Sequence, residues 1–238
     1  MMNTIFRDLI ADGSMTVYMD DMAMHTTRRP EETDEEHVAR HHAIVNQVLQ
    51  KLDEHDLYLN PDKSDFELPY IDFLGVRVAD GMVQMEQGKV DKVQDWKPPR
   101  NVTEVRCFLG FTGYYQYFIQ GYSQIMQPLL DLTKQATLWH WTTDQQKAFE
   151  GLRDKMCDKP VLRQPNFHKM FYLQTDASAY GVGAVLSQEG ESTNSKPKCH
   201  PVTYYSATFT PMEQRYDIYE HKLLAVIKAL ENWRAYLI

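Results

Sequence analysis

Two adjacent aspartates, Asp20 and Asp21, interrupt the strand-like run TVYMDDMAMH at residues 16–25. Apolar residues alternate on both sides of the pair, a pattern that predicts a β-hairpin with the acids at its bend. Two ionised carboxylates this close repel each other, and half-burying them adds a desolvation cost that a hydrogen-bond network or a metal ion must offset. An exposed Asp-Asp turn is the simpler alternative, but it does not need apolar flanks. The hairpin therefore favours a divalent cation bound by carboxylate oxygens on rigid strands.

The length and composition of the chain predict a globular protein. Its 238 residues are 43% hydrophobic, which can support real cores. No 18-residue apolar stretch occurs, and Arg7 and Asp8 break the N-terminal segment before a signal-like apolar core can form, so we expect no membrane partner. The widely spaced Cys107, Cys157 and Cys199 include no CxxC pair, which predicts reduced thiols in an intracellular protein.

The net charge of -8 is unevenly distributed. Residues 1–70 hold 15 acids and 6 bases, residues 71–165 hold 11 and 12, and residues 166–238 hold 7 and 7. This asymmetry predicts separate modules, and any phosphate contact must rely on local basic patches.

The first part of the chain alternates helix and hairpin patterns. A helix is expected before Gly13, then the hairpin, then a long helix that begins at the capping pair Thr33 and Glu36. The apolar positions expected on one face of that helix are Val38, Val45, Val48, Leu49 and Leu52. The segment LNPDKSDF predicts a turn, and YIDFLGVRVADGMVQM predicts a second hairpin closed by Asp80-Gly81.

Residues 88–163 have the pattern of a small helical module. Asn101 with Glu104 and Thr142 with Gln145 are expected to cap two of its helices. The proline-containing segment CDKPVLRQPNFHK predicts a tether, followed by strands in MFYLQTDAS, YGVGAVLSQ and HPVTYYSATF and a polar loop EGESTNSKPK. A final helix is predicted to begin at Thr210. With no cap before the first helix and no stop signal after the last, we expect a piece of a longer protein.

Five motifs stand in one order: VYMDDMAMH, LNPDKSDF, FLGVRVADG, FLGFTGYYQYFI and TDASAYGVGAVLSQ. Together they resemble the reverse transcriptase and ribonuclease H region of a gypsy-class LTR retrotransposon pol polyprotein. The resemblance implies an α+β fold class with three modules. These are a partial reverse transcriptase palm at 1–87, a helical thumb at 88–163, and the N-terminal part of a ribonuclease H-like α/β fold at 164–238.

This resemblance implies a multifunctional enzyme: an RNA-directed DNA polymerase, which is a nucleotidyltransferase, joined to an RNA–DNA hybrid ribonuclease, which is an endonuclease. Asp20 and Asp21 would hold Mg²⁺ for two-metal phosphoryl transfer, and Asp176 would be the first metal-binding carboxylate of the ribonuclease. The implied partners are an RNA or DNA template-primer, deoxynucleotide triphosphates and the rest of the pol polyprotein. The implied location is intracellular, in a cytoplasmic particle or the nucleus.

The same resemblance assigns contact residues. Tyr18, Met19 and Lys63 would lie near the nucleotide or primer, although the position of Lys63 in a turn favours a solvated lysine over a phosphate contact. The matching residues of the primer-grip hairpin are Phe73, Leu74 and Gly75. Duplex contact in the thumb would come from Arg100, Arg106, Tyr114 and Tyr115, although the tyrosines also suit a helix core. Gln116 and Tyr117 stand where the family commonly has two basic residues, so phosphate contact there should be weaker.

Two departures from the family predict lost activity. The third polymerase aspartate has no match at Asp8 or Asp12, so this chain alone is expected to be inactive. In YEHKLLAV, Lys222 occupies the position of the second ribonuclease carboxylate, and an ammonium there would repel magnesium. Glu220 cannot easily replace it, because two residues along a helix is about 200° around its axis. The alternative function is a non-catalytic retrotransposon relic that binds nucleic acid or a protein partner.

Three other motifs predict no site. His37, His41 and His42 have helical spacing but lack a further ligand, so a solvated helix face is favoured over a metal site. YGVGAVLS has Leu186 where a dinucleotide fingerprint needs glycine. TDAS is not the Asp-Thr/Ser-Gly of an aspartic protease.

Overall fold

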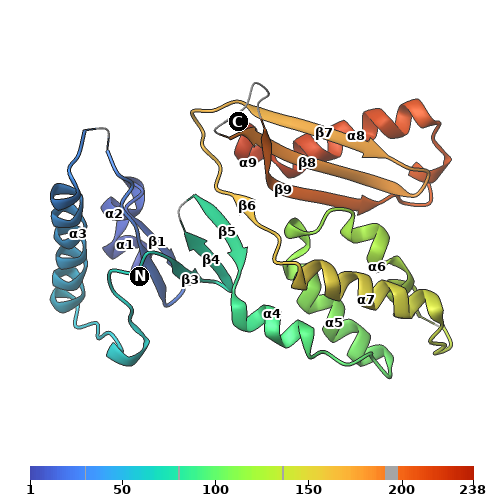
Figure 1. The fold of residues 1–238 in the computed structure, drawn as a ribbon, viewed down its shortest axis with the longest axis horizontal. Coiled ribbons are helices and arrows are strands. Elements are labelled where there is room, and N and C mark those ends of the chain that lie inside the picture. Colours follow the sequence, from blue (N-terminus) through green and yellow to red (C-terminus); the bar gives the residue numbers. More distant parts are fainter. Residues whose placement is uncertain (30, 80, 136, 191–197) are drawn as a thin grey trace. The chain divides into compact units, whose positions relative to one another are not determined.

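A computed structural model shows a mixed helix and sheet fold, which confirms the α+β fold class (Figure 1). It describes residues 1–29, 31–79, 81–135, 137–190 and 198–238. The chain divides into two compact units, Met1–Phe73 and Leu74–Ile238. The module boundaries at 87/88 and 163/164 stay predictions.

The first unit is built around the predicted hairpin. Helices α1 (Met2–Ile5) and α2 (Arg7–Ala11) precede strands β1 (Met15–Tyr18) and β2 (Asp21–Met24). The strands pair antiparallel, with Met15 opposite Met24 and Tyr18 opposite Asp21, so the hairpin prediction is confirmed. Helix α3 (Asp34–Glu54), the short turn η1 (Pro61–Lys63) and strand β3 (Ile71–Phe73) complete the unit.

One small core holds the first unit together. Phe6, Leu9, Met15, Val48 and Leu52 are buried against one another, and they come from α1–α2, β1 and α3. The predicted capping box is confirmed, because Thr33 and Glu36 exchange hydrogen bonds at the start of α3. Val48 and Leu52 face the core as expected. Val38 and Leu49 do not, since 48% and 39% of their surfaces are exposed.

A carboxylate fixes the loop before α3. Arg40 donates from Nε and Nη2 to the two oxygens of Glu32 at 2.7 and 2.9 Å, and from Nη2 to the carbonyl of Thr27 at 2.8 Å. This bidentate pairing holds the pKa of Glu32 well below its usual range. The loop that leaves the hairpin is therefore tied to the first turns of α3.

The second unit begins with a small sheet and a helical core. Strands β4 (Val76–Ala79), β5 (Met82–Met85) and β6 (Leu162–Arg163) are antiparallel neighbours. The helices are α4 (Gln87–Gln94), α5 (Val102–Tyr114), η2 (Gln116–Phe118), α6 (Tyr122–Asp131) and α7 (Thr143–Cys157). Their core is aromatic at its centre, where the Phe108 ring lies 4.8 Å from Phe149 and 5.5 Å from Trp96.

Two expectations for this part are confirmed and one is corrected. Asn101 caps α5 through the backbone N–H of Glu104, and Thr142 with Gln145 forms the capping box of α7. The segment predicted as a plain tether contains β6, whose Leu162 is 2% exposed and pairs with Val83. Burial of this leucine makes the segment part of the core. The Asp80 half of the predicted second turn lies outside the described residues.

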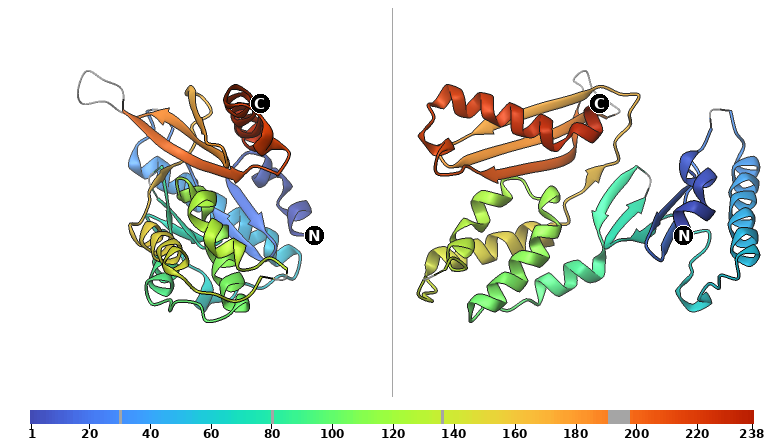
Figure 2. Two further views of the ribbon diagram at one scale, coloured as in Figure 1. Left: turned by 90° about the vertical axis from the view of Figure 1, so that its right-hand side faces the viewer. Right: turned by 180° about the vertical axis from the view of Figure 1, so that it is seen from behind.

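The chain ends in a three-stranded antiparallel sheet covered by a helix. Strands β7 (Phe171–Ala177), β8 (Gly181–Glu189) and β9 (Cys199–Thr208) lie in that order. Helix α8 (Ile218–Asn232) lies along one face of the sheet, followed by α9 (Arg234–Leu237) (Figures 1 and 2). Ala225 and Ala229 of α8 are fully buried, so their small side chains allow the helix to approach the sheet closely. Residues 191–197 of the predicted polar loop lie outside the described part.

The start of the last helix differs from the prediction. Thr210 and Glu213 do form a capping pair, but it precedes only the short turn η3 (Glu213–Arg215). The helix itself begins after Asp217, whose carboxylate accepts the backbone N–H groups of Tyr219 and Glu220. Two successive capping signals therefore compete in the sequence, and the second one starts the long helix.

Strand β9 joins the sheet to the helical part of the second unit. The backbone N–H of Ser123, in α6, donates to Oγ of Ser206, in β9, at 2.9 Å. Tyr204, also in β9, packs against the aromatic helical core. The sheet thus has α8 on one face and contacts to η2 and α6 through β9.

Candidate active sites and nucleic-acid interface

The hairpin tip presents Asp20 and Asp21 to solvent. Both side chains are exposed, and among the described residues no hydrogen bond or ion pair engages either carboxylate. The expectation of half-buried acids is therefore corrected: both carboxylates are open to solvent, whose high dielectric constant weakens the repulsion between them. Two unused carboxylates at the tip of a paired hairpin fit a hard divalent cation. In the described ranges, however, no three His, Cys, Asp or Glu side chains come together as a metal site.

The bend itself is strained. Met19 has φ of 54°, a left-handed conformation that is uncommon for residues other than glycine. Its side chain is 76% exposed and that of Tyr18 51% exposed, so neither is held there by burial. Such outliers cost about 1–3 kcal/mol each and cluster at functional sites. The backbone here aims the two predicted contact residues and the adjacent carboxylates outward.

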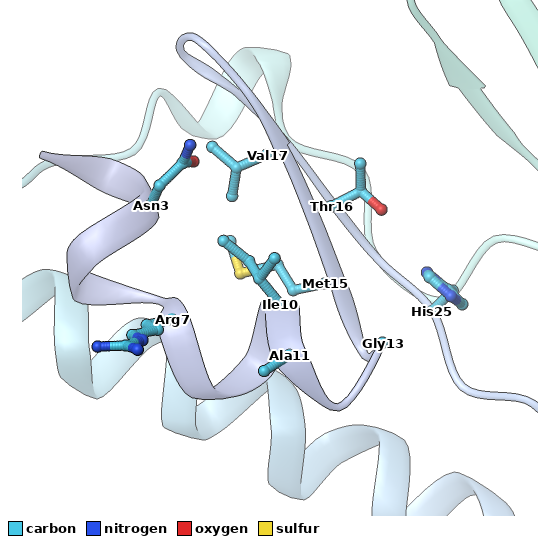
Figure 3. A pocket seen from close by; sticks show the side chains of 9 residues that line it. All are labelled: Asn3, Arg7, Ile10, Ala11, Gly13, Met15, Thr16, Val17 and His25. Atoms are coloured by element: carbon cyan, nitrogen blue, oxygen red, sulfur yellow. The ribbon is translucent and has the colours of Figure 1, made fainter. Parts of the chain in front are cut away.

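A hollow of about 570 Å³ lies beside β1, between that strand and helices α1 and α2. Figure 3 shows Ile10 and Met15 together at its centre, with Arg7 at one end and His25 at the other. Neither aspartate of the hairpin tip lines it. The hollow is thus separate from the carboxylate pair.

Lys63 ends the short turn η1, which Asn60 caps by accepting the backbone N–H of Asp62. Its side chain is exposed and makes no ion pair within the part of the chain that the structure describes. Both interpretations of Lys63 therefore remain compatible with its position.

The predicted primer-grip residues lie where β3 ends and β4 begins. Phe73 is half-buried, and Leu74 and Gly75 have φ of 51° and 77°, as in a two-residue hairpin turn. Tyr114 donates to the carbonyl of Leu74 at 2.6 Å, and Tyr115 donates to that of Gly75 at 3.1 Å. Two neighbouring tyrosines of α5 thus hold the turn by its backbone.

This arrangement corrects the expectation for Tyr115. Its side chain is 2% exposed, and burial raises the pKa of its hydroxyl to about 12, so it packs in the core and positions the turn. Tyr114 is 53% exposed and keeps a free surface beside the turn. The tyrosine pair therefore divides into one packing residue and one surface residue.

The exposed side of α5 carries the remaining thumb candidates. Arg106 is exposed and donates from Nη2 to the carbonyl of Thr133, which leaves other guanidinium donors free. Arg100 is exposed just before the helix. Between Arg106 and Tyr114 lies Gly110, where an added Cβ would meet nothing within 4 Å. Gly110 was not predicted as a surface residue from the sequence, although its spacing of four residues from both Arg106 and Tyr114 places all three on one side of a helix.

Asp176 lies near the end of β7, opposite Gly183 of β8. Its neighbours Leu173 and Ala177 belong to the clusters packed under α8, so strand alternation places Asp176 on the other face of the sheet. The side chain is exposed and caps the backbone N–H of Ala177.

Lys222 is exposed in the first turns of α8, about 60° around the axis from the buried Ala225. Glu220 is turned about 140° from Ala225, and its carboxylate accepts the backbone N–H of Asp217 at 3.0 Å in the capping box. Glu220 is therefore both misdirected and already engaged. No ion pair joins Lys222 to Asp176 in the described residues.

Known families match both ends of the chain. Residues 1–78 match the family described as reverse transcriptase (RNA-dependent DNA polymerase), and residues 141–238 match the RNase H-like domain found in reverse transcriptase. The transposon Tf2-3 and Tf2-4 polyproteins of Schizosaccharomyces pombe are 37% identical over 99% of the chain. The chain belongs to the reverse transcriptases. As the motif order predicted, it represents the reverse transcriptase and ribonuclease H region of a gypsy-class retrotransposon polyprotein, and it spans 17% of the length of these relatives.

Solved reverse transcriptases share its fold. The foamy viral protease-reverse transcriptase dRH in complex with ds DNA has a TM-score of 0.80 at 21% identity, covering 97% of this chain and 38% of that one. The foamy viral protease-reverse transcriptase in complex with RNA/DNA hybrid has a TM-score of 0.78 at 22% identity, covering 98% and 30%. Within its described residues, this reverse transcriptase chain has no helix with the length and hydrophobicity needed to span a bilayer.

Proposed function

We propose that this reverse transcriptase chain carries the metal-binding hairpin of an RNA- and DNA-templated DNA polymerase. The observation that carries the proposal is the pair of exposed, unengaged carboxylates of Asp20 and Asp21 at a strained hairpin tip. Magnesium ions bound there would stabilise the charge that develops on the attacking and leaving oxygens during phosphoryl transfer. The hairpin itself fixes the carboxylates through the β1–β2 pairing and the core under it.

We further propose that the exposed side of α5 lies against the template-primer duplex. Gly110 leaves the helix backbone open to close approach, while Arg106 offers charge to phosphates and Tyr114 a planar ring. Tyr114 also holds the Leu74 carbonyl, so the turn and the helix would present one continuous surface to the primer. The foamy viral relatives bound to ds DNA and to RNA/DNA hybrid support this kind of ligand.

The ribonuclease region is the weaker of the two proposed activities. Asp176 is exposed and available to a magnesium ion, but the position on α8 that the family resemblance assigns to a glutamate holds Lys222. A cation there opposes metal binding. This observation favours the second candidate, a relic that binds nucleic acid without cleaving it, for the ribonuclease part of the chain.

The proposed partners follow from these activities. They are an RNA or DNA template-primer, deoxynucleotide triphosphates near Tyr18, Met19 and Lys63, and the rest of the polyprotein. We place the protein inside the cell, in a cytoplasmic particle or in the nucleus, on the resemblance alone.

Substitution of the hairpin carboxylates tests the polymerase proposal. In the full-length polyprotein enzyme, Asp20→Asn or Asp21→Asn is expected to abolish primer extension on a poly-A template with Mg²⁺. The melting temperature of the 238-residue chain should change by no more than a few degrees, because removing one of two repelling charges does not weaken the hairpin. Without substitutions, the 238-residue chain should not extend a primer, since its described residues bring only two carboxylates together where two-ion chemistry needs several.

Asp53→Asn is the matched control, because it removes one exposed carboxylate from α3 of the same unit. Primer extension by this variant should equal that of the unsubstituted enzyme. Extension that survives Asp21→Asn would overturn the proposal. Unfolding of either hairpin variant would instead assign the acids a structural role.

A further inference from the structure

A second surface of the helical part has the chemistry of a nucleic-acid site. A groove of about 600 Å³ lies between the segment after α4 and the segment before α7. It is lined by Lys97, Pro98, Pro99, Arg100, Trp139, Trp141 and Gln146. A neighbouring hollow of about 360 Å³ shares Lys97, Pro98 and Arg100.

The aromatic wall of the groove is a stacked pair of indoles. The ring centroids of Trp139 and Trp141 lie 5.9 Å apart at an interplanar angle of 26°. Trp141 is fixed, because its Nε1 donates to Gln146 at 2.8 Å and its ring meets Phe149 of the core edge-on. Trp139 stacks on this fixed ring and remains 37% exposed. A large planar surface is thus held rigidly at the solvent boundary.

The charge of the groove is positive. Among the described residues, Lys97 and Arg100 are its only ionisable lining residues, and no carboxylate lines it. Both side chains are exposed, and no ion pair engages either of them in the residues that the structure describes. Glu104 lines only the neighbouring hollow, and its carboxylate accepts the backbone N–H of Arg100 and the side-chain amide of Asn101. Two unpaired cations therefore stand beside the indole pair.

We propose that this groove binds single-stranded nucleic acid, with a base stacked on Trp139 and backbone phosphates at Lys97 and Arg100. Aromatic faces beside cations are the recurring means of binding single strands without sequence preference, because every base has a π-face. The buried Pro99 and the adjacent Pro98 give the groove a stiff wall. An acidic or proline-rich peptide is the competing occupant, but the former gives the indoles nothing to stack on and the latter leaves both cations without a partner.

This site is separate from the proposed duplex surface. Arg106, Gly110 and Tyr114 do not line the groove, and none of the groove residues lies on the exposed side of α5. The groove would accordingly hold an unpaired strand, RNA or DNA, while α5 holds a paired one. Loss of one kind of binding should leave the other intact.

Oligonucleotide titrations of the 238-residue chain test the inference. The probe is a fluorescein-labelled strand of about 12 thymidines, a length within the site sizes of single-strand proteins. Trp139→Ala is expected to raise its Kd about tenfold, as for one lost base stack. Lys97→Gln with Arg100→Gln should reduce the slope of log K against log salt by about 1.4, because each lost phosphate contact contributes about 0.7 for single strands. Binding of an RNA–DNA hybrid duplex should stay unchanged in Trp139→Ala and in the single variant Lys97→Gln, whereas Arg100 is also a predicted duplex contact and its substitution is not part of this comparison.

Leu138→Ala is the matched control for the aromatic substitution. Leu138 is the 88% exposed neighbour of Trp139 and does not line the groove, so this variant should bind the strand like the unsubstituted chain. Indole fluorescence gives a second readout: of the four tryptophans, Trp139 should account for most of the quenching by the strand. Melting temperatures show that each variant is folded, and the double cation variant keeps the inference testable if Trp139→Ala unfolds.

Three results would overturn the inference. The first is equal single-strand affinity in Trp139→Ala and Leu138→Ala. The second is an unchanged salt slope in the double cation variant. The third is displacement of the strand by an acidic or proline-rich peptide that binds more tightly than the strand itself. Loss of duplex binding alone would count against the proposed function and not against this groove.

Discussion

Met19 has a strained backbone at the tip of the hairpin that we propose binds metal. Its φ of 54° is a conformation that glycine adopts without strain, and its side chain is largely exposed. Packing therefore does not explain the strain. The tight bend explains it, because only Met19 and Asp20 lie between the last paired residues, Tyr18 and Asp21.

Substitution of Met19 by glycine tests whether the backbone at the hairpin bend is strained. Met19→Gly is expected to leave the 238-residue chain as stable as before, or more stable by up to about 1 kcal/mol, because released strain exceeds or balances the added flexibility. Thr16→Gly, on the neighbouring exposed strand position, should instead cost about 1 kcal/mol. Urea unfolding measures both. A larger loss for Met19→Gly than for Thr16→Gly would show that the backbone at Met19 is not strained.

Lys222 is expected to lower both magnesium binding and hybrid cleavage by the ribonuclease region. In the full-length polyprotein, the ribonuclease region should cleave an RNA–DNA hybrid poorly, and Lys222→Glu should raise both its magnesium affinity and its cleavage rate, because the change replaces a repelling charge with a ligand. Hybrid cleavage and isothermal titration with Mg²⁺ measure the two effects. Lys228→Glu is the control on the same helix, since that lysine pairs with Glu213 instead.

One outcome would show that the placement of α8 in the family pattern is wrong. It is efficient cleavage by the unsubstituted enzyme that Asp176→Asn removes and Lys222→Glu leaves unchanged. Glu220 would then have to leave its capping contact with Asp217 to serve as the ligand.

Helix α5 combines packing on one side with a free surface on the other. Val105, Phe108 and Thr112 are fully buried, while Arg106 and Gly110 face solvent. A glycine in the middle of a helix lowers stability relative to alanine. Its presence at an exposed position midway between Arg106 and Tyr114 is consistent with the proposed close contact.

Alanine at Gly110 should change stability and binding in opposite directions. Gly110→Ala is expected to stabilise the chain by about 0.5–1 kcal/mol and to weaken binding of a hybrid duplex severalfold, because the new methyl group faces the ligand. Arg106→Gln should lower the salt slope by about 0.9, the contribution of one phosphate contact in a duplex. Gly151→Ala on α7 is the control: an added Cβ there meets only Ile125 at an ordinary 3.6 Å. Unchanged duplex binding in both Gly110→Ala and Arg106→Gln would contradict the proposed surface.

Local signals predicted the elements better than the contacts between them. Caps at Thr33, Asn101 and Thr142 act through residues three positions away, so the sequence contains the whole interaction. The predicted start of the last helix at Thr210 was wrong, because a second, equally local cap at Asp217 follows it. Only packing of α8 on the sheet decides between the two caps. Burial of Tyr115 depends on the turn at Gly75, which lies 40 residues earlier and leaves no periodic signal.

The candidate sites show the same limit. Adjacent aspartates in an apolar run and a lysine in a family glutamate position are visible in the sequence. The stacking of Trp139 on Trp141 next to Arg100 is not, because the groove arises from two segments that only the folded chain brings together.

The two compact units have separate cores. In the second unit the helical core and the clusters between the sheet and α8 are distinct, and strand β9 connects the two parts, since it faces the helices through Tyr204 and Ser206. The proposed duplex-binding helix and the ribonuclease-like sheet therefore belong to one body and should unfold together.

Removal of one hydroxyl should show this coupling. Ser206→Ala leaves the N–H of Ser123 without its partner and is expected to cost about 1–3 kcal/mol. Ser64→Ala, in an exposed turn of the first unit, should cost less than about 1 kcal/mol. Hydrogen exchange locates the effect: faster exchange in both α6 and β9 for Ser206→Ala is expected. Faster exchange confined to one of the two would mean that the helical and sheet parts are independent.

The contact between Gly75 and Tyr115 predicts which pairs of substitutions related retrotransposon copies can carry. A Cβ at position 75 would lie 2.7 Å from the Tyr115 hydroxyl, closer than real Cβ atoms come to any neighbour. A copy that gained a side chain at 75 alone would push that hydroxyl from its place, and a copy that lost the hydroxyl alone would leave the Gly75 carbonyl with only one of its two donors, the backbone N–H of Glu86. Drift at these two codons should therefore be correlated: sister copies in which residue 75 is no longer glycine should also lack tyrosine at 115, although 40 positions separate them.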